Sequence, residues 1–535
     1  MVRTRWARAR TVADYEALKA RRDAAKRAKD LFQPLLDEAY EYAIPYRRGI
    51  MKTGSGEERV NRVFDSTAMV AAHRFAGKFA RDIFPPGFFS IEPGDWLPDT
   101  DLKDRMREEV ASVAKKVDTF FLSGEWEQAK HEMGIDLAGG NAALLVLPGT
   151  LAKPVRFIVA PMDEVMFENG PYNDVTGVFW ERKWTLRAIA QEFPNGKFTD
   201  EMRQRMARKP EEEVTLYQDT LWQPGSEPQA GRWVRHAWCE SNEKTIIETT
   251  QSRTCPWITP RYFRVPGEVY GRGVLMLAMP AIRTLNVAQK IMLQAAAIAM
   301  LGIYTAIDDG VFNPDNSPLS PGVFWKVARN GGVLGPSVQR FPDPRIDLSG
   351  LVIDKLQLAV KSAMNDKALP AETGAVRSPT EIIERVKQIA FDDVGAFGRL
   401  VHEGVVPLVK RCIEIAYDMK MIAQDIQIDD FILRVDVRSP MAMARQQMHS
   451  ESILQYLQIV GALYPDKPQM VDQLAHRDRA AHHVARALMV PHDIVPTDRE
   501  RAQIAERQAA EQAAMMAAAA AAADPQAAAT SMEPA

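Results

Sequence analysis

The sequence predicts an α+β protein that is mainly helical. Apolar residues recur at helical spacing before residue 121 and again after residue 440. Between residues 142 and 265 the pattern changes to short runs rich in Val, Ile, Phe, Tyr and Trp, which is typical of antiparallel strands. With 535 residues the chain is several times the usual size of one domain, so we expect two or more packed cores or one elongated subunit.

Three helices are expected in the first 121 residues. Apolar side chains follow a helical spacing over residues 12–43, and Pro45 ends the pattern. A second helix is expected over 66–83, where Pro85 stops it, and a third over 102–121.

Four strands are expected in the middle region, over residues 155–159, 178–184, 214–222 and 233–239. We interpret the tryptophans of these strands as core residues, because large aromatic rings dominate the packing of protein interiors.

Residues 274–300 are almost wholly apolar, apart from one narrow polar stripe at helical spacing. The stripe consists of Arg283, Asn286, Lys290 and Gln294. Most of the circumference of this helix must therefore be buried. Two interpretations remain open: a helix deep in the core of one subunit, or a helix wedged between identical neighbours in a ring, which keeps only the stripe in water.

A turn-rich segment follows over residues 301–341, with turn signals such as Asp309-Gly310 and Asn313-Pro314 between short apolar pieces. We expect a small β insertion here. Helical spacing resumes over 348–364, so the two helices that flank the insertion are expected to lie antiparallel.

Residues 366–377 lack periodicity and predict a loop. Ser378, Pro379 and Glu381 then form a capping signal for a helix that extends to about residue 420. Four positions are expected to kink this helix: Gly395, Gly398, Gly404 and Pro407.

The last part of the chain begins with a strand near residues 431–437, in which apolar and polar residues alternate. Helices are expected over 441–463 and 471–489. An alanine-rich, low-complexity tail starts at residue 509 and is expected to be helical at first.

The charge balance limits the partners that the whole chain can attract. The formal net charge is −3, so any DNA contact must be local. The first thirty residues are basic and include Arg21 and Arg22, and we interpret this region as a solvated helix or arm.

Cysteine usage and hydropathy predict a protein made in the cytoplasm. Cys239, Cys255 and Cys412 are widely spaced and form no CxxC pair, which predicts neither a disulfide framework nor a metal site. The most apolar run, residues 291–303, is too short to span a bilayer, and the N-terminus lacks the apolar core of a signal peptide.

A search for catalytic patterns gives no convincing candidate. Phosphate-binding GxxxxGK[ST] and nucleophile GxSxG patterns are absent from the sequence. Metal-dependent nucleases hold cations on carboxylates at strand ends, but the acids available here lack suitable spacing or a partner lysine, and the nearby histidines lack partner ligands. The residues considered are Asp99, Asp101, Lys103, Asp430, Asp436, His476, His482 and His483. We therefore expect neither enzymatic activity nor a cofactor.

Several blocks of the sequence resemble a known family. The most specific block is Tyr270-Gly271-Arg272-Gly273, which is followed by Pro280, Ile282, Arg283, Leu285 and Asn286. Further blocks occur in the same order as in that family: Asp65-Ser66-Thr67, Phe84-Pro85-Pro86, Gly395, Arg399, Leu400, Glu403, Pro407, Leu408 and Ser439-Pro440-Met441-Ala442. The chain thus resembles the portal or head-to-tail connecting proteins of T7-like podoviruses over residues 15–460.

This resemblance implies a subunit with wing, stem, clip and crown regions that assembles into a dodecameric ring around a DNA channel. The regions implied are a wing over 1–272, a first stem helix over 273–300, a clip over 301–346, a second stem helix over 347–365, a tunnel loop over 366–378, a wing spine helix and strand over 379–440, crown helices over 441–508 and the tail over 509–535.

The function implied is that of a conduit for DNA packaging and ejection at one capsid vertex, in the virion and, during assembly, in the host cytoplasm. The implied partners are double-stranded DNA, the terminase large subunit, tail adaptor and nozzle proteins, and the major capsid and scaffolding proteins, with no membrane. Candidate DNA-channel residues are Lys367, Arg377, Arg283 and Lys290, and candidate docking residues in the clip are Asp308, Asp309, Trp325, Lys326 and Arg329.

Two alternative functions remain. A packaging-associated metal-dependent nuclease would need a carboxylate cluster. Another virion structural or ejection protein is the second alternative. For such a protein we would expect long uninterrupted helices and not two helices separated by a β insertion.

Overall fold

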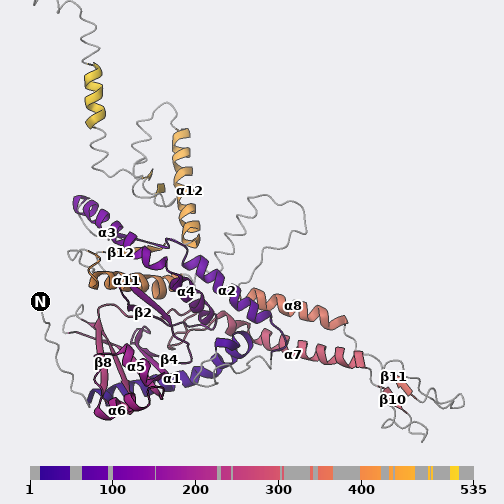
Figure 1. Ribbon diagram of the computed structural model, residues 1–535. Coiled ribbons are helices and arrows are strands. Elements are labelled where there is room, and N and C mark those ends of the chain that lie inside the picture. The colour runs from indigo at the N-terminus through magenta and orange to yellow at the C-terminus, as the bar shows by residue number, and fades with distance from the viewer. Residues whose placement is uncertain are drawn as a thin grey trace, which may run out of the picture. The chain divides into compact units, whose positions relative to one another are not determined.

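The computed structural model confirms a mixed helix and sheet protein that is mainly helical (Figure 1). It describes residues 13–47, 63–93, 100–150, 152–225, 231–242, 245–301, 304–306, 338–340, 347–364, 398–422, 433–437, 440–463, 480–481, 484–485 and 506–516. The chain forms two compact units: Met1–Phe84 with Lys116–Ile426, and Pro85–Lys115 with Gln427–Ala535.

A five-stranded antiparallel sheet, with strand order β4-β5-β6-β7-β8, is the largest sheet of the first unit. Its strands are β4 (Val165–Asn169), β5 (Val175–Thr185), β6 (Glu213–Gln223), β7 (Arg232–Cys239) and β8 (Ile246–Ser252). The strands predicted over 178–184, 214–222 and 233–239 are therefore confirmed, whereas β4 and β8 were not predicted individually.

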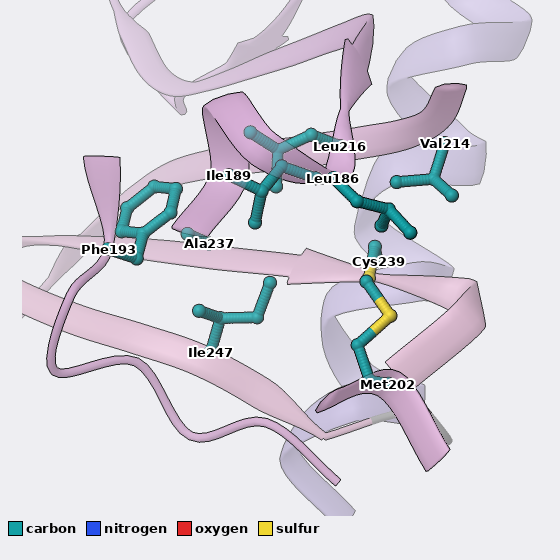
Figure 2. Close-up of a cluster of buried hydrophobic side chains, with 9 residues drawn as sticks. All are labelled: Leu186, Ile189, Phe193, Met202, Val214, Leu216, Ala237, Cys239 and Ile247. Carbon is teal, nitrogen blue, oxygen red and sulfur yellow. The ribbon is translucent and has the colours of Figure 1, made fainter. Parts of the chain in front are cut away.

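Two short helices, α5 (Leu186–Glu192) and α6 (Asp200–Arg208), cover one face of this sheet. The side chains of Thr185 and Thr199 accept a backbone N–H two or three residues into each helix and so begin them. The helices and the strands share the apolar cluster in Figure 2: Leu186, Ile189, Phe193, Met202, Val214, Leu216, Ala237, Cys239 and Ile247. A short 3-10 turn, η2 (Glu240–Asn242), follows β7.

The long helix α1 (Ala13–Ala43) packs on the opposite face of the sheet. Side chains alternate between the faces of a strand, so Leu221 contacts α1 while Leu216 belongs to the α5–α6 side. The predicted helix over 12–43 is confirmed, and η1 (Pro45–Arg47) follows it.

The interpretation of the basic N-terminal region as a solvated helix or arm is wrong for Arg22 of α1, which is buried, whereas Arg21 stays partly exposed. The Arg21 guanidinium forms two hydrogen bonds with Glu168, and Arg22 pairs with Glu181 at 2.6 Å and lies 3.6 Å from the ring centroid of Tyr217. These contacts fasten α1 to the sheet, because buried cations require a paired charge or an aromatic face.

A second, three-stranded sheet has the order β3-β2-β9, with β2 (Leu144–Pro148), β3 (Val155–Val159) and β9 (Trp257–Ile258). Helices α2 (Thr67–Ile83) and α4 (Gly124–Ala138) pack beside each other in the same unit. Their aromatic core includes Trp126, whose ring lies about 5 Å from those of Phe84, Phe121 and Phe157. Helix α2 confirms the prediction over 66–83, and α4 was not predicted.

Helices α7 (Val274–Leu301) and α8 (Asp347–Ala363) run side by side, as predicted (Figure 1). Two short antiparallel strands, β10 (Tyr304–Ala306) and β11 (Val338–Arg340), pair at the end of this helical hairpin. The β insertion is confirmed only in this pair, since residues 307–337 lie outside the described residues.

The helix predicted up to residue 420 is described from residue 398. It contains a π-helical turn, η4 (Val401–Val405), and continues as α11 (Val406–Asp418). The π-helical turn lies where kinks were predicted at Gly404 and Pro407. Gly395, the cap at Ser378 and the loop over 366–377 lie outside the described residues.

The second unit contains an antiparallel pair of strands, β1 (Phe89–Pro93) and β12 (Leu433–Val437), and helix α12 (Pro440–Leu463). Helix α3 (Thr100–Phe121) crosses the boundary between the units. The predicted strand near 431–437 and helices over 102–121 and 441–463 are confirmed. In the part of the tail that is described, residues 506–516 are helical.

Candidate functional site

The base of α7 is formed by a tight loop that contains the Tyr270-Gly271-Arg272-Gly273 block. Phe263 and Arg272 exchange both backbone hydrogen bonds, at 3.0 and 2.7 Å, and thereby close the loop just before the helix begins. Asn141 fixes the same loop from the neighbouring chain segment: its amide nitrogen donates to the Gly271 carbonyl at 3.1 Å, and its amide oxygen accepts the Gly271 N–H at 2.7 Å.

Glycine is required here because backbone segments meet directly. Gly140 has a φ of +118°, and a Cβ atom on it would lie 2.6 Å from the Gly271 carbonyl oxygen and 2.7 Å from the Gly273 nitrogen. A Cβ atom on Gly273 would clash with the backbone of Ala138, Gly139 and Gly140. The glycines of this block therefore allow α7 to begin directly against the end of α4.

Tyr270 connects the same loop to α1 and β4. Its ring stacks on Phe32 of α1 at 4.8 Å and on Phe167 of β4 at 5.5 Å, and its hydroxyl oxygen accepts the Phe167 N–H at 3.1 Å. Burial raises the pKa of Tyr270 well above its usual range, so the phenol stays neutral and able to donate.

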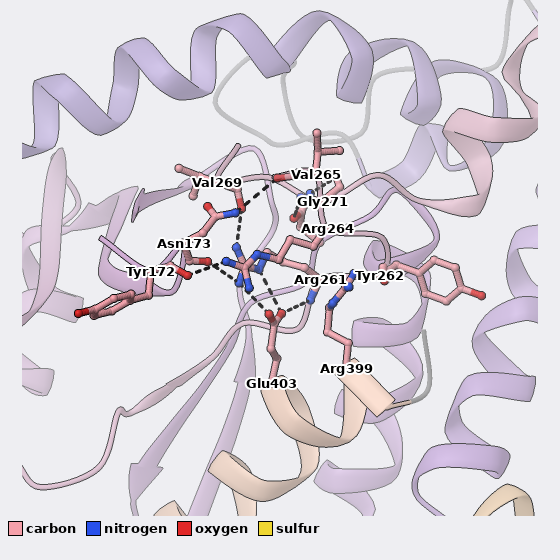
Figure 3. A network of polar contacts seen from close by, with 11 residues as sticks. Tyr172, Asn173, Arg261, Tyr262, Arg264, Val265, Val269, Gly271, Arg399 and Glu403 are labelled. Atoms are coloured by element: carbon pink, nitrogen blue, oxygen red, sulfur yellow. Dashed lines mark hydrogen bonds and ion pairs between the residues drawn. The ribbon is translucent and has the colours of Figure 1, made fainter. Parts of the chain in front are cut away.

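Arg261 lies at the centre of a buried polar network, which Figure 3 shows. Its side chain is only 3% exposed and forms a two-pronged pair with Glu403 of η4, with Nη2 to Oε1 at 2.7 Å and Nε to Oε2 at 3.1 Å. The same guanidinium donates to the carbonyl oxygens of Asn173 and Val269. One cation therefore joins the β4–β5 turn, the loop before α7 and the π-helical turn.

Three of the four residues of the polar stripe of α7, Arg283, Lys290 and Gln294, are exposed, and only Asn286 is buried within the subunit. Asn286 is 8% exposed, and its side-chain oxygen accepts the Phe64 N–H at 2.7 Å. Arg283 pairs with Glu38 of α1, and the Lys290 ammonium lies 5.5 Å from the centroid of the Phe64 ring. The helical spacing showed that these residues share one face of α7. It did not show that Glu38 of α1 and Phe64 lie against that face.

Apolar side chains of α7 are exposed in the single chain as well. Leu277, Val287 and Ile291 are 60%, 54% and 58% exposed. These residues lie at helical spacing along one side, and beyond Asn286 none of the α7 residues whose burial is described is buried. The second half of α7 thus presents several apolar side chains that this chain does not cover.

The other residues predicted to contact DNA or partners lie outside the described residues: Lys367, Arg377, Asp308, Asp309, Trp325, Lys326 and Arg329. The structure therefore brings together Arg283 and Lys290 on α7 but gives no geometry for the tunnel-loop and clip residues.

Chemistry at a metal is not indicated by the part of the chain that is described. No group of three or more His, Cys, Asp or Glu side chains in it is placed to hold a metal ion. Asp101 and Lys103, two of the candidates for a nuclease signature, belong to helix α3 and not to strands. Across the same described residues, the helices are all too short or too polar to cross a membrane.

Comparison with known proteins identifies the family. A sequence model of the bacteriophage head to tail connecting proteins matches residues 15–495. The chain belongs to this family. The connector is also similar to the probable portal protein of Bordetella phage BPP-1, with 22% identity over 502 residues that cover 89% of this chain and 88% of the relative. Neither comparison points to a nuclease or an ejection protein.

Several blocks of sequence that resemble the family take part in contacts between distant segments of the first unit. Asp65 of the first block accepts a hydrogen bond from Gln357 of α8, and the adjacent Phe64 binds Asn286 of α7. Glu403 of a later block binds Arg261, which lies beside the glycine loop. Sequence reasoning did not find Arg261 or Asn141, because their partners are distant in the sequence and neither residue type suggests a particular role.

Proposed function

We propose that this connector is the portal subunit of a bacteriophage, which forms a dodecameric ring at one capsid vertex. DNA passes through the ring during packaging and ejection. The ring binds the terminase large subunit, later the tail adaptor and nozzle proteins, and contacts the major capsid and scaffolding proteins. Binding, and not catalysis, is the proposed activity, in the virion and during assembly in the host cytoplasm.

The proposed regions follow the resemblance. Residues 1–272 form the wing, 273–300 and 347–365 the two stem helices, and 301–346 the clip. Residues 366–378 are the tunnel loop, 379–440 the wing spine, 441–508 the crown and 509–535 the tail. The α7–α8 hairpin with the β10–β11 pair at its end supports the assignment of stem and clip.

The apolar side chains of α7 that the single chain leaves exposed are the observation that best supports a ring. A ring is built from heterologous contacts, in which one surface of a subunit packs against a different surface of the next. Val287 and Ile291 on α7, and Val352 and Leu358 on α8, are exposed apolar residues on one helical hairpin. Several large apolar side chains exposed on one hairpin favour a protein interface, so we infer that neighbouring copies cover them.

DNA contacts in the channel are proposed to be few and transient. Many Lys or Arg contacts to phosphates would release counterions, bind tightly and stall translocation. Arg283 is paired with Glu38, which weakens its attraction for phosphate and makes Lys290 the better candidate on α7. We expect Lys367→Glu with Arg377→Glu to alter DNA retention or packaging while rings still form; normal packaging by these rings would contradict the assignment.

Docking of terminase and adaptor is proposed for the clip, through Asp308, Asp309, Trp325, Lys326 and Arg329. Deletion of residues 307–337 should abolish adaptor binding in a pull-down assay while the stem helices remain. Unchanged adaptor binding by this variant would refute the assignment.

The direct test of the proposed function is negative-stain electron microscopy of the purified protein, with its mass measured by light scattering. Rings with a central channel and a mass near twelve subunits are the expected result. A monomer that stays monomeric when scaffolding and capsid proteins are added would contradict the proposal.

A further inference from the structure

Arg182 of β5 is a partly buried cation on the face of the five-stranded sheet that carries the apolar cluster of Figure 2. Its guanidinium carbon lies 3.9 Å from the centroid of the Trp180 ring and 3.5 Å from that of the Trp184 ring. The side chain forms no hydrogen bond or ion pair with any described residue, and its Nε atom is buried. Two indole rings therefore hold the guanidinium in place, while its N–H groups lack an acceptor.

Gln218 of β6 lies beside Arg182 on the same face of the sheet. Residues that are directly opposite each other in paired strands share a face, and Gln218 is opposite Trp180 on β5 and Ala237 on β7. Gln218 is 4% exposed, and its amide oxygen is buried without a hydrogen-bond partner among the described residues. A buried amide in this state costs free energy, so a polar group bound beside it would stabilise the fold.

Arg235 of β7 completes a diagonal of three polar side chains across β5, β6 and β7. It is opposite Thr220, two residues beyond Gln218, so Gln218 has an arginine on either side at the diagonal spacing of about 7–8 Å. The Nε atom of Arg235 donates one hydrogen bond, to the Thr250 hydroxyl at 3.3 Å. No ion pair joins Arg235 to another described residue. Two guanidinium groups thus flank one buried amide.

Three acidic side chains lie near these arginines without binding them. Glu164 accepts the indole N–H of Trp180 at 3.1 Å, and Glu192 pairs with Arg156 at 3.8 Å. The charges of Glu164, Glu192 and Glu248 favour the charged arginines, but none of the three forms an ion pair with either one in the described part of the chain. The acids of this chain therefore act on the two guanidinium groups only over longer distances.

This attraction does not fully compensate the two positive charges. Burial lowers the pKa of Arg182 to about 10, and the charge of Arg235 adds to that shift. Burial also lowers the pKa of Arg235, and the charge of Arg411 adds to it. Both shifts persist against the attraction of the nearby acids. An anion bound between the arginines would restore the balance, because it stabilises the charged form of both.

We propose that Arg182, Gln218 and Arg235 form a binding site for an oxyanion, that is, a phosphate or carboxylate group. Both arginines are partly exposed, so the anion reaches them from the solvent. A guanidinium presents parallel N–H groups that match two oxygens of such an anion, and the amide can turn either its oxygen or its NH2 group toward it. All three residues belong to one chain, so the site does not depend on ring formation.

Isothermal titration calorimetry of the full chain with sodium phosphate, at constant ionic strength, tests the site. We expect saturable binding by the wild type and affinity weakened by about tenfold or more in Arg182→Met, which fills the space between the indole rings but donates no hydrogen bond. Arg187→Gln is the control, because Arg187 is exposed and pairs with Glu211, and it should bind phosphate like the wild type. No saturable binding by the wild type, or equal affinity in Arg182→Met, would overturn the proposal.

Gln218→Met separates binding from folding. It removes the unpartnered amide without changing any charge, so the unfolding midpoint in phosphate-free buffer should be equal to that of the wild type or higher. Phosphate affinity should nevertheless fall by about threefold or more. Wild-type affinity in this variant would contradict the site. If Arg182→Met does not fold, Arg235→Gln replaces it, with the same expected loss of affinity and the same contrary result.

Titration with sodium acetate in place of phosphate distinguishes the two sources of the anion. Acetate that binds with similar affinity, and competes with phosphate, assigns the site to carboxylate groups. Binding of phosphate alone assigns it to phosphate groups. Binding of neither anion would overturn the proposal. None of these measurements needs ring assembly, so failure of the anion site and failure of the portal function are distinguishable.

Discussion

The two halves of α7 have similar apolar sequences but opposite surroundings. In the first half, Leu275, Ile282 and Leu285 are buried, and the helix begins on a glycine junction. In the second half, Val287, Ile291 and Leu293 are exposed. Composition alone does not separate the halves. Side chains of the same chain therefore cover much of the first half of α7. We infer that a neighbouring copy covers the second half.

The largest effect on the stability of the single chain is expected where α7 begins, at Gly273. Gly273→Ala places a Cβ atom against the backbone of Ala138 and Gly140, which cannot yield without moving α4 or α7. The free energy of unfolding should fall by more than about 3 kcal/mol in a denaturant titration. Gly77→Ala is the control, because no atom lies within 4 Å of its added Cβ. Equal free energies of unfolding for the two variants would show that glycine is not required where α7 meets α4.

A smaller effect is expected at the boundary between the halves. Asn286→Ala leaves the Phe64 N–H without its side-chain acceptor and should lower the free energy of unfolding by about 1–3 kcal/mol. Gln294→Ala, two turns further along the same stripe, is exposed and should change it little. Equal free energies of unfolding for the two variants would show that the hydrogen bond between Asn286 and the Phe64 N–H does not stabilise the fold.

The ion pair between α7 and α1 is expected to matter least for stability. Arg283 and Glu38 are both partly in water, where side-chain entropy and salt offset the attraction. Arg283→Gln should change the unfolding transition by less than the error of the titration, and raising the salt concentration should not widen the difference from wild type. A marked loss of stability would contradict this expectation and would mean that the pair is needed to hold α7 on α1.

Local sequence signals predicted most of the described helices. Apolar spacing and Pro45 placed the end of α1 correctly, and the same reasoning located α7 and α8. Helix α4 was missed because Glu, Lys and Gly interrupt its apolar pattern. In the structure the Ser123 side chain begins this helix by accepting the Trp126 N–H. The position of α4 beside the glycine loop is what makes it part of the site.

Partners that are distant in the sequence were not predictable. The stripe on α7 was recognised, but Glu38 and the Phe64 N–H are more than 200 residues away from it, and nothing in the spacing of α7 points to them. Kinks were predicted at Gly404 and Pro407, but neither residue indicated a π-helical turn or its contact with Arg261. Glu403 was found only through the family resemblance.

The inference that a second copy covers the exposed half of α7 is tested most directly by substitutions in that half alone. Val287→Asp with Ile291→Asp should leave the unfolding transition of the single chain nearly unchanged, because both side chains are exposed in it. The same double variant should abolish ring assembly measured by light scattering, since neighbouring copies would have to bury two carboxylates. Leu122→Asp, at a comparably exposed residue after α3, is the control and should assemble. Rings formed normally by the double variant would contradict the claim that a second copy covers this face.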